Sequence, residues 1–157
     1  MQQDQRIGVK MKYDVGLPGR IIIARADHGD DITGGIEKII ERENIKTAVL
    51  YLIGALEKAS MVTGPEQCTV PPVPNWVSFS DGRELIGLGT VATTGEGTPV
   101  IHLHGAVGKE RETLAGCIRE EAFTYLTMEI IIVEITGTKA FRVYREDWGA
   151  HVLDFDF

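Results

Sequence analysis

The chain has 157 residues, the usual size of one folded domain, and we expect a single domain over residues 1–157. Hydrophobic residues make up 43% and charged residues 25%, which excludes a wholly disordered chain. Sixteen Lys and Arg against 23 Asp and Glu give a net charge of −7. Half of the basic residues stand beside acids, as in Lys109-Glu110-Arg111-Glu112, and no basic stripe is visible, so binding to nucleic acid through its phosphates is not expected.

Cysteine content and apolar stretches indicate the compartment. Two cysteines, Cys68 and Cys117, do not make a disulfide framework and fit a reducing environment. The N-terminal residues lack the basic-then-apolar plan of a signal peptide. The longest strongly apolar stretch, 47–56, is too short to cross a bilayer. We therefore expect a cytoplasmic protein without membrane contact.

The N-terminal part predicts strands followed by one clear helix. Apolar residues alternate over 7–13, which is typical of a half-buried strand, and an isoleucine-rich strand follows over 20–26. Isoleucines at positions 32, 36, 39 and 40 lie on one face of an amphipathic helix that should end near Asn44.

The remainder predicts mostly strands. The stretch 47–53 favours a buried strand that Gly54 interrupts before it continues through 60–62. Asp81-Gly82 favours a hairpin turn between strands at 76–80 and 84–93. Further strands are predicted at 100–107, 128–135 and 140–144, a weaker helix or a loop at 115–123, and an edge strand or docking tail at 152–157. The fold class expected is α+β, with a central, mostly antiparallel sheet flanked by one or two helices.

His102-Leu103-His104 is the sharpest chemical feature. Alternate residues of a strand share a face, so both imidazoles should point the same way. Two residues advance about 6.6 Å along a strand, a span that two imidazoles can close on one metal ion. The alternative is two polar residues on a solvated face, because a zinc site needs three or four ligands.

A third ligand must come from elsewhere in the chain. The candidates are His28, Cys68, Cys117 and His151. Cys117 follows the histidines by 13 residues, enough for one loop to return, and a thiolate is a good zinc ligand. A small buried hydrophobic residue is the alternative role for this cysteine.

Other polar or glycine-rich stretches have simpler explanations. The acids of 27–31 could bind a hard cation, but the spacing is not that of a calcium loop, and capping of the following helix explains them. Gly87-Leu88-Gly89 lies inside a strand pattern, where glycine marks a bulge or a close backbone approach. No glycine-rich phosphate loop and no serine nucleophile motif is present in the sequence.

Several segments, in order, resemble the plant-and-prokaryote-conserved (PPC) domain. An arginine precedes a Gly-Asp-rich helix start, a strand ends in a small-residue turn, and a Gly-Arg-Glu-Leu segment leads to a His-x-His strand. The corresponding residues are 25–31, 50–56, 81–90 and 99–104, and 127–131 is similar to the family's closing Glu-containing strand.

The resemblance implies an α+β fold, a homotrimer and, in many prokaryotic members, zinc. Prokaryotic members carry a Gly-Gly-His stretch whose histidine is a third zinc ligand, and this stretch reads Ala115-Gly116-Cys117 here. The resemblance therefore implies zinc held by His102, His104 and Cys117. Plant members join the domain to DNA-binding AT-hooks, which this sequence lacks.

Three classes of function remain open from the sequence. The first is a trimeric binding or regulatory module, with zinc as a structural element or as the anchor of a small-molecule ligand. The second is a zinc-dependent, hydrolase-like enzyme, with Glu84 or Glu129 as the acid to consider as general base. The third is a DNA-associated protein by analogy with the plant members, which the acidic charge opposes.

Overall fold

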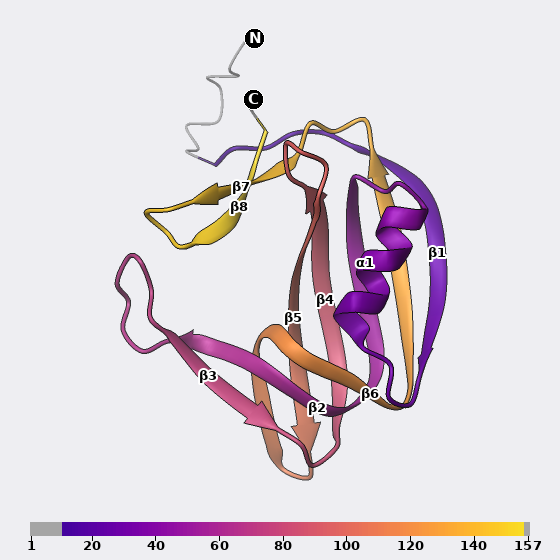
Figure 1. Ribbon diagram of the computed structural model, residues 1–157, viewed down its shortest axis with the longest axis vertical. Helices are drawn as coiled ribbons and strands as arrows, with labels where there is room; N and C mark the ends of the chain where they lie inside the picture. Colours follow the sequence, from indigo (N-terminus) through magenta and orange to yellow (C-terminus); the bar gives the residue numbers. More distant parts are fainter. Residues whose placement is uncertain (1–10, 156–157) are drawn as a thin grey trace.

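A computed structural model of the protein describes residues 11–155 (Figure 1). A six-stranded sheet forms most of this part, with one helix packed against it and a separate pair of strands near the C-terminus. The elements are β1 (Leu17–Asp27), α1 (Ile32–Arg42), β2 (Thr47–Pro65), β3 (Pro74–Phe79), β4 (Arg83–Thr93), β5 (Pro99–Lys109), β6 (Glu112–Thr136), β7 (Phe141–Arg145) and β8 (Ala150–Asp154).

The predicted mostly antiparallel sheet is confirmed. All pairings between these strands are antiparallel, and their order in the sheet is β1-β6-β5-β4-β2-β3. Of the one or two helices predicted, residues 11–155 contain one. No helix in this range is long and apolar enough to cross a membrane.

β6 joins the sheet together, because it pairs with three other strands. It pairs with β5 at its start, with β2 along most of its length and with β1 at its end. β2 also pairs with β4, and β4 with β5. The strands β6, β5, β4 and β2 therefore form a closed ring of pairings. Glu121 and Leu126 have positive φ angles of 52° and 58° and lie where the register with β2 shifts, so β6 bends at these points.

The hydrophobic core lies between α1 and one face of the sheet. Ile32, Ile36 and Ile40, all within 1% of full burial, lie on the helix face that packs against the sheet, as the isoleucine spacing predicted. The sheet contributes the alternate, inward-pointing residues of its strands. They include Leu50, Leu52, Leu85, Leu103, Met128, Ile130 and Ile132.

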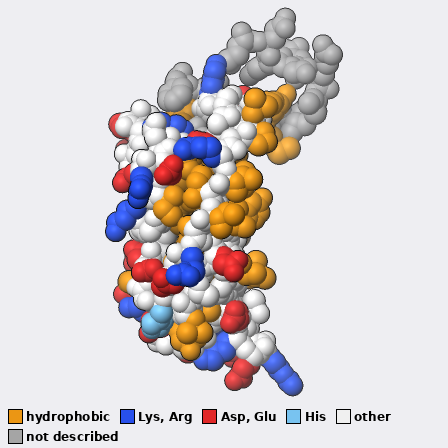
Figure 2. Space-filling view, turned by 90° about the vertical axis from the view of Figure 1, so that its right-hand side faces the viewer, with side chains coloured by type: hydrophobic (Ala, Val, Ile, Leu, Met, Phe, Trp, Pro, Cys, Tyr) orange, Lys and Arg blue, Asp and Glu red, His pale blue; other side chains and the backbone are white. Residues whose placement is uncertain are grey.

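The opposite face of the sheet, which we call the outer face, is also apolar. Ile23 on β1, Ile53 on β2 and Ile86 on β4 are 78%, 60% and 72% exposed. Ile21, Tyr51, Leu88 and Ile131 extend the same face. Apolar side chains gather in a broad area on the side of the molecule on which β1 lies (Figure 2). Exposed apolar area of this extent usually marks an interaction surface.

Most of the predicted elements are confirmed. Gly54 does not end β2, which continues past it with a register shift towards β6. Residues 11–13 are not in a strand, and the rest of the strand predicted at 7–13 lies outside the described residues. The confirmed elements are the helix from residue 32 and the strands predicted around 20–26, 47–62, 76–80, 84–93, 100–107, 128–135 and 140–144.

The prediction of a helix or loop over 115–123 was wrong, because this stretch belongs to β6. Its first residues, 115–117, pair with β5, and residues 117–123 pair with β2, so its backbone hydrogen bonds are those of a strand. Cys117 and Ile118 are consecutive and both buried, which breaks the alternation that would have identified a strand.

The hairpin predicted at Asp81-Gly82 was also wrong. β3 and β4 do not pair with each other: β3 pairs with residues 59–65 of β2, and β4 pairs with residues 47–56 of the same strand. Gly82 has a φ of +69°, and its N–H donates to the carbonyl of Glu57. Asp81-Gly82 is therefore the break between β3 and β4, which pair with successive parts of the same strand, β2.

Candidate metal centre

His102 and His104 lie side by side on the outer face of β5. Leu103 between them is 1% exposed and points into the core, as strand alternation requires. The two Nε2 atoms are 3.1 Å apart, and the rings cross at 81°. In a tetrahedral zinc site with bonds near 2.05 Å, two nitrogens lie about 3.4 Å apart, so the pair is close to the separation that one ion needs.

Cys117 is brought to the histidines by the pairing of β5 with β6. It lies directly opposite His104 in that ladder, and its side chain is buried. One ligand atom from each of the three residues lies within 4.8 Å of the other two. A nitrogen and a sulfur on one zinc are about 3.6 Å apart, so a small closure of the thiol would complete the geometry. The donor set of two imidazoles and one thiol fits zinc.

The surroundings of the cluster favour the unprotonated form of His102. Partial burial lowers the pKa of His102, and the positive charges of Arg142, His104 and Arg119 lower it further. Burial raises the pKa of the Cys117 thiol, and Arg119 opposes this effect. Because zinc binds neutral imidazole and thiolate, His102 is ready to ligate at neutral pH, whereas Cys117 must lose a proton to the solvent.

Gly89 on β4 lets β5 approach closely beside the cluster. A Cβ at this position would lie 2.9 Å from the carbonyl oxygen of His102, and 3.3 Å from the Cα of Leu103. The β4–β5 ladder runs without a register shift, so of the two meanings predicted for Gly87-Leu88-Gly89 the close approach holds and the bulge does not.

The other residues considered as third ligand lie apart from this cluster. His28 accepts the N–H of Leu126, His151 packs its ring against Tyr144, and Cys68 is exposed in the loop before β3. Over the described range, 11–155, the cluster of His102, His104 and Cys117 is the one group of three or more such ligands found within metal-binding reach.

The acids proposed for other chemistry are not beside the histidines. Glu84 lies four residues along β4 from Leu88, the residue opposite His104, which is about 13 Å along the strand. Glu129 lies on β6 opposite Ile53, with β4 between this pair and β5. Neither is positioned to take a proton from a metal-bound water as general base.

The acidic stretch 27–31 is occupied with local contacts. Asp30 accepts the N–H of Asp27, and Asp31 accepts the Thr33 hydroxyl. Asp31 occupies the N-cap position of α1 as predicted, but its side chain does not bond to the helix N–H groups.

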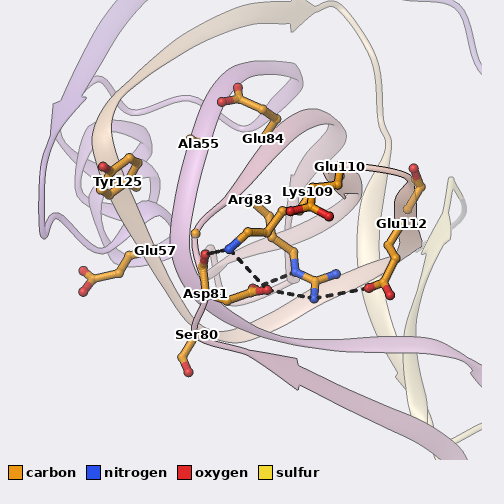
Figure 3. Close-up of a pocket in the computed structure, with 13 residues that line it drawn as sticks. Ala55, Glu57, Ser80, Asp81, Arg83, Glu84, Lys109, Glu110, Glu112 and Tyr125 are labelled. Carbon is orange, nitrogen blue, oxygen red and sulfur yellow. Dashed lines mark hydrogen bonds and ion pairs between the residues drawn. The ribbon is translucent and has the colours of Figure 1, made fainter.

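A pocket of about 790 Å³ lies elsewhere, at the break between β3 and β4 (Figure 3). Arg83 forms a two-pronged contact with Asp81, at 2.8 and 3.2 Å, and Lys109 also pairs with Asp81. None of the metal-centre residues lines it. Its two cations, Arg83 and Lys109, are already paired with its own carboxylates, so the pocket offers no unpaired cation to an anionic ligand.

The sequence of this chain matches the model of a known protein family. The sequence model of the Plants and Prokaryotes Conserved (PCC) domain, the family written PPC above, matches residues 13–136. The chain belongs to the PCC domain family. The match covers β1 to β6 and includes all three residues of the cluster. No match was found among curated proteins.

Solved structures share the PCC fold. A protein of Archaeoglobus fulgidus described as metal-containing is 22% identical, with a TM-score of 0.78 over 90% of this chain and 98% of its own. A PPC protein of Pyrococcus horikoshii has the same identity and TM-score, over 94% and 100%. A candidate DNA-binding protein of Bacteroides thetaiotaomicron is 19% identical, with a TM-score of 0.73 over 90% and 99%. At these identities the likeness establishes the fold alone.

Proposed function

We propose that this PCC protein is a trimeric zinc-binding module that binds or regulates through its metal centre. The observation that carries the proposal is the group of three ligand atoms, from His102, His104 and Cys117, within 4.8 Å. With three protein ligands, zinc keeps a fourth position for water or a ligand atom. The metal-containing description of the Archaeoglobus fulgidus protein, which shares the fold, supports the same reading.

The proposed roles divide between the two kinds of ligand. The histidines would hold the ion through Nε2 from a rigid strand, and Cys117 would add a negative charge from below the surface. Bound zinc would act as a Lewis acid that polarises whatever occupies its fourth position. Since neither Glu84 nor Glu129 lies beside the cluster, ligand binding is better supported than hydrolysis.

We predict one zinc per chain after purification without chelators. His102→Ala and His104→Ala should each lose it, because two remaining ligands hold zinc poorly. Cys117→Ser, which keeps the volume of the side chain, should reduce zinc content strongly. The measurement is elemental analysis of purified protein, with His151→Ala as the control, since His151 contacts Tyr144 rather than the cluster.

The variants separate the parts of this proposal. Full zinc in either His102→Ala or His104→Ala would reject the site. Full zinc in Cys117→Ser, together with loss in both histidine variants, would keep the pair but reject the cysteine. Loss in His151→Ala would show that zinc loss follows from any histidine change.

The trimer is supported by the outer face and by the family resemblance. Ile23, Ile53 and Ile86 are mostly exposed although they lie on three strands of one sheet. Association that covers this face would remove its apolar area from water. Light scattering should give three times the chain mass of 17.3 kDa. A mass of one chain would reject the proposal.

We predict no tight binding to DNA at physiological salt. The net charge is −7, and Arg20, Arg83 and Arg145 each hold a carboxylate at 2.8 Å, so their charge is locally neutralised. Fluorescence polarisation with a labelled AT-rich duplex should show no saturable binding below about 1 µM protein. Salt-sensitive binding in that range would contradict the prediction and revive the DNA-associated alternative.

A further inference from the structure

Arg142 on β7 is a buried cation without a carboxylate partner. Arg142 is only 6% exposed, and its Nη2 donates a hydrogen bond to the Thr90 hydroxyl at 2.8 Å. Its Nε–H is buried and has no hydrogen-bond partner. Among the described residues no acid forms an ion pair with it, and burial lowers its pKa. A buried guanidinium without a counter-ion is costly and calls for an anion.

This guanidinium lies beside the metal centre. Thr90, which accepts its hydrogen bond, is directly opposite His102 in the β4–β5 ladder. Directly opposite residues share a face of the sheet, so Arg142 and His102 are both neighbours of Thr90 on the outer face. The charge of Arg142 accordingly lowers the pKa of His102, second only to burial.

The charge around the cluster is unbalanced. Arg119 follows Cys117 by two residues on β6, so a second arginine lies near the same site. A bound zinc ion adds two positive charges, and the Cys117 thiolate offsets one of them. An anion at the fourth zinc position would reduce this repulsion and would also satisfy the donors of Arg142.

We propose that the fourth zinc position takes a small oxyanion, a carboxylate or a phosphate, whose other oxygen binds the guanidinium of Arg142. The inference rests on the proposed zinc site and specifies the ligand of that site. Guanidinium has five N–H donors in a planar fork that matches two oxygens, and one of them is held by Thr90. Arg142 lies outside residues 13–136, so the anion partner belongs to this chain's C-terminal hairpin and not to the matched domain.

The test is calorimetric titration of the zinc-loaded protein with inorganic phosphate and, separately, with acetate. We expect saturable binding of at least one of them, and the tighter one identifies the phosphate or the carboxylate class. Arg142→Gln should weaken this binding about tenfold or more while zinc content stays at one per chain. Arg145→Gln is the matched control, since it is on the same strand but exposed and paired with Asp147.

A second readout observes the metal ion directly. Wild-type protein loaded with Co²⁺ should change its visible spectrum when the anion displaces water at the metal, and Arg142→Lys should need a higher anion concentration for the same change. Unchanged affinity in Arg142→Gln, or no binding and no spectral change in zinc- or cobalt-loaded wild type, would overturn the inference and leave the zinc site standing. Absence of metal binding by wild type would overturn both proposals.

Discussion

Ile53→Lys combined with Ile86→Glu should convert the proposed trimer into monomers. Both residues are directly opposite on β2 and β4, in the middle of the outer face, and each is 60% or more exposed in the isolated chain. Burial of an isoleucine side chain contributes about 1.5–3 kcal/mol, and a charge placed in an apolar interface adds a desolvation cost. Each subunit carries the change, so these losses are multiplied over the assembly.

The design keeps the monomer folded. A lysine and a glutamate in directly opposite positions form a favourable cross-strand pair, and the net charge of −7 is unchanged. Light scattering over a concentration series is the measurement. Val73→Glu, on an exposed residue of the loop before β3, is the control that should leave the mass of the assembly unaltered. A trimer in the double variant would locate the interface elsewhere on the molecule.

Ile36→Ala should lower the free energy of unfolding by about 2–5 kcal/mol. Ile36 is fully buried at the centre of the α1 face that covers the sheet, so its removal leaves a cavity that the close-packed neighbours cannot fill. Ile36→Val should lose about 0.5–1.5 kcal/mol, and Glu37→Ala on the exposed side of the helix should lose little.

Urea unfolding followed by circular dichroism is the measurement for this series. All variants must be compared at one protein concentration, because the stability of an oligomer depends on it. A loss below about 1 kcal/mol in Ile36→Ala would mean that α1 contributes little to the core and is held by the chain connection alone.

The sequence predicted those elements whose side chains follow a local period. The isoleucines of α1 and the alternation around His102 and His104 depend only on residues near each other in the chain, so both were predicted correctly. The strand at 115–123 was missed because its identity depends on two partner strands, and its buried residues are consecutive where it passes between them.

In the candidate site, too, the features set by neighbouring residues were predicted, and those set by contacts between distant strands were harder to predict. Strand alternation placed the two histidines together, but spacing alone left four candidates for a third ligand. The family resemblance pointed to Cys117, and the pairing of His104 with Cys117 shows how this residue reaches the histidines. Arg142 gave no signal in the sequence, because an arginine beside ordinary strand residues is normally exposed. Its burial depends on the position of β7 next to β4, a contact between residues about 50 positions apart, as in the bond from Arg142 to Thr90.

The long β6 has a consequence for how the chain is made. β1, β2 and β5 each have a strand edge that is paired by β6. The β1–β6 ladder joins residues as distant as Leu17 and Thr136. During synthesis β1, β2 and β5 therefore emerge before β6, and the edges that β6 pairs are open at that stage. Such edges template association between chains, so the nascent polypeptide is most exposed to aggregation just before β6 leaves the ribosome. The sheet can therefore close only after β6 has been translated.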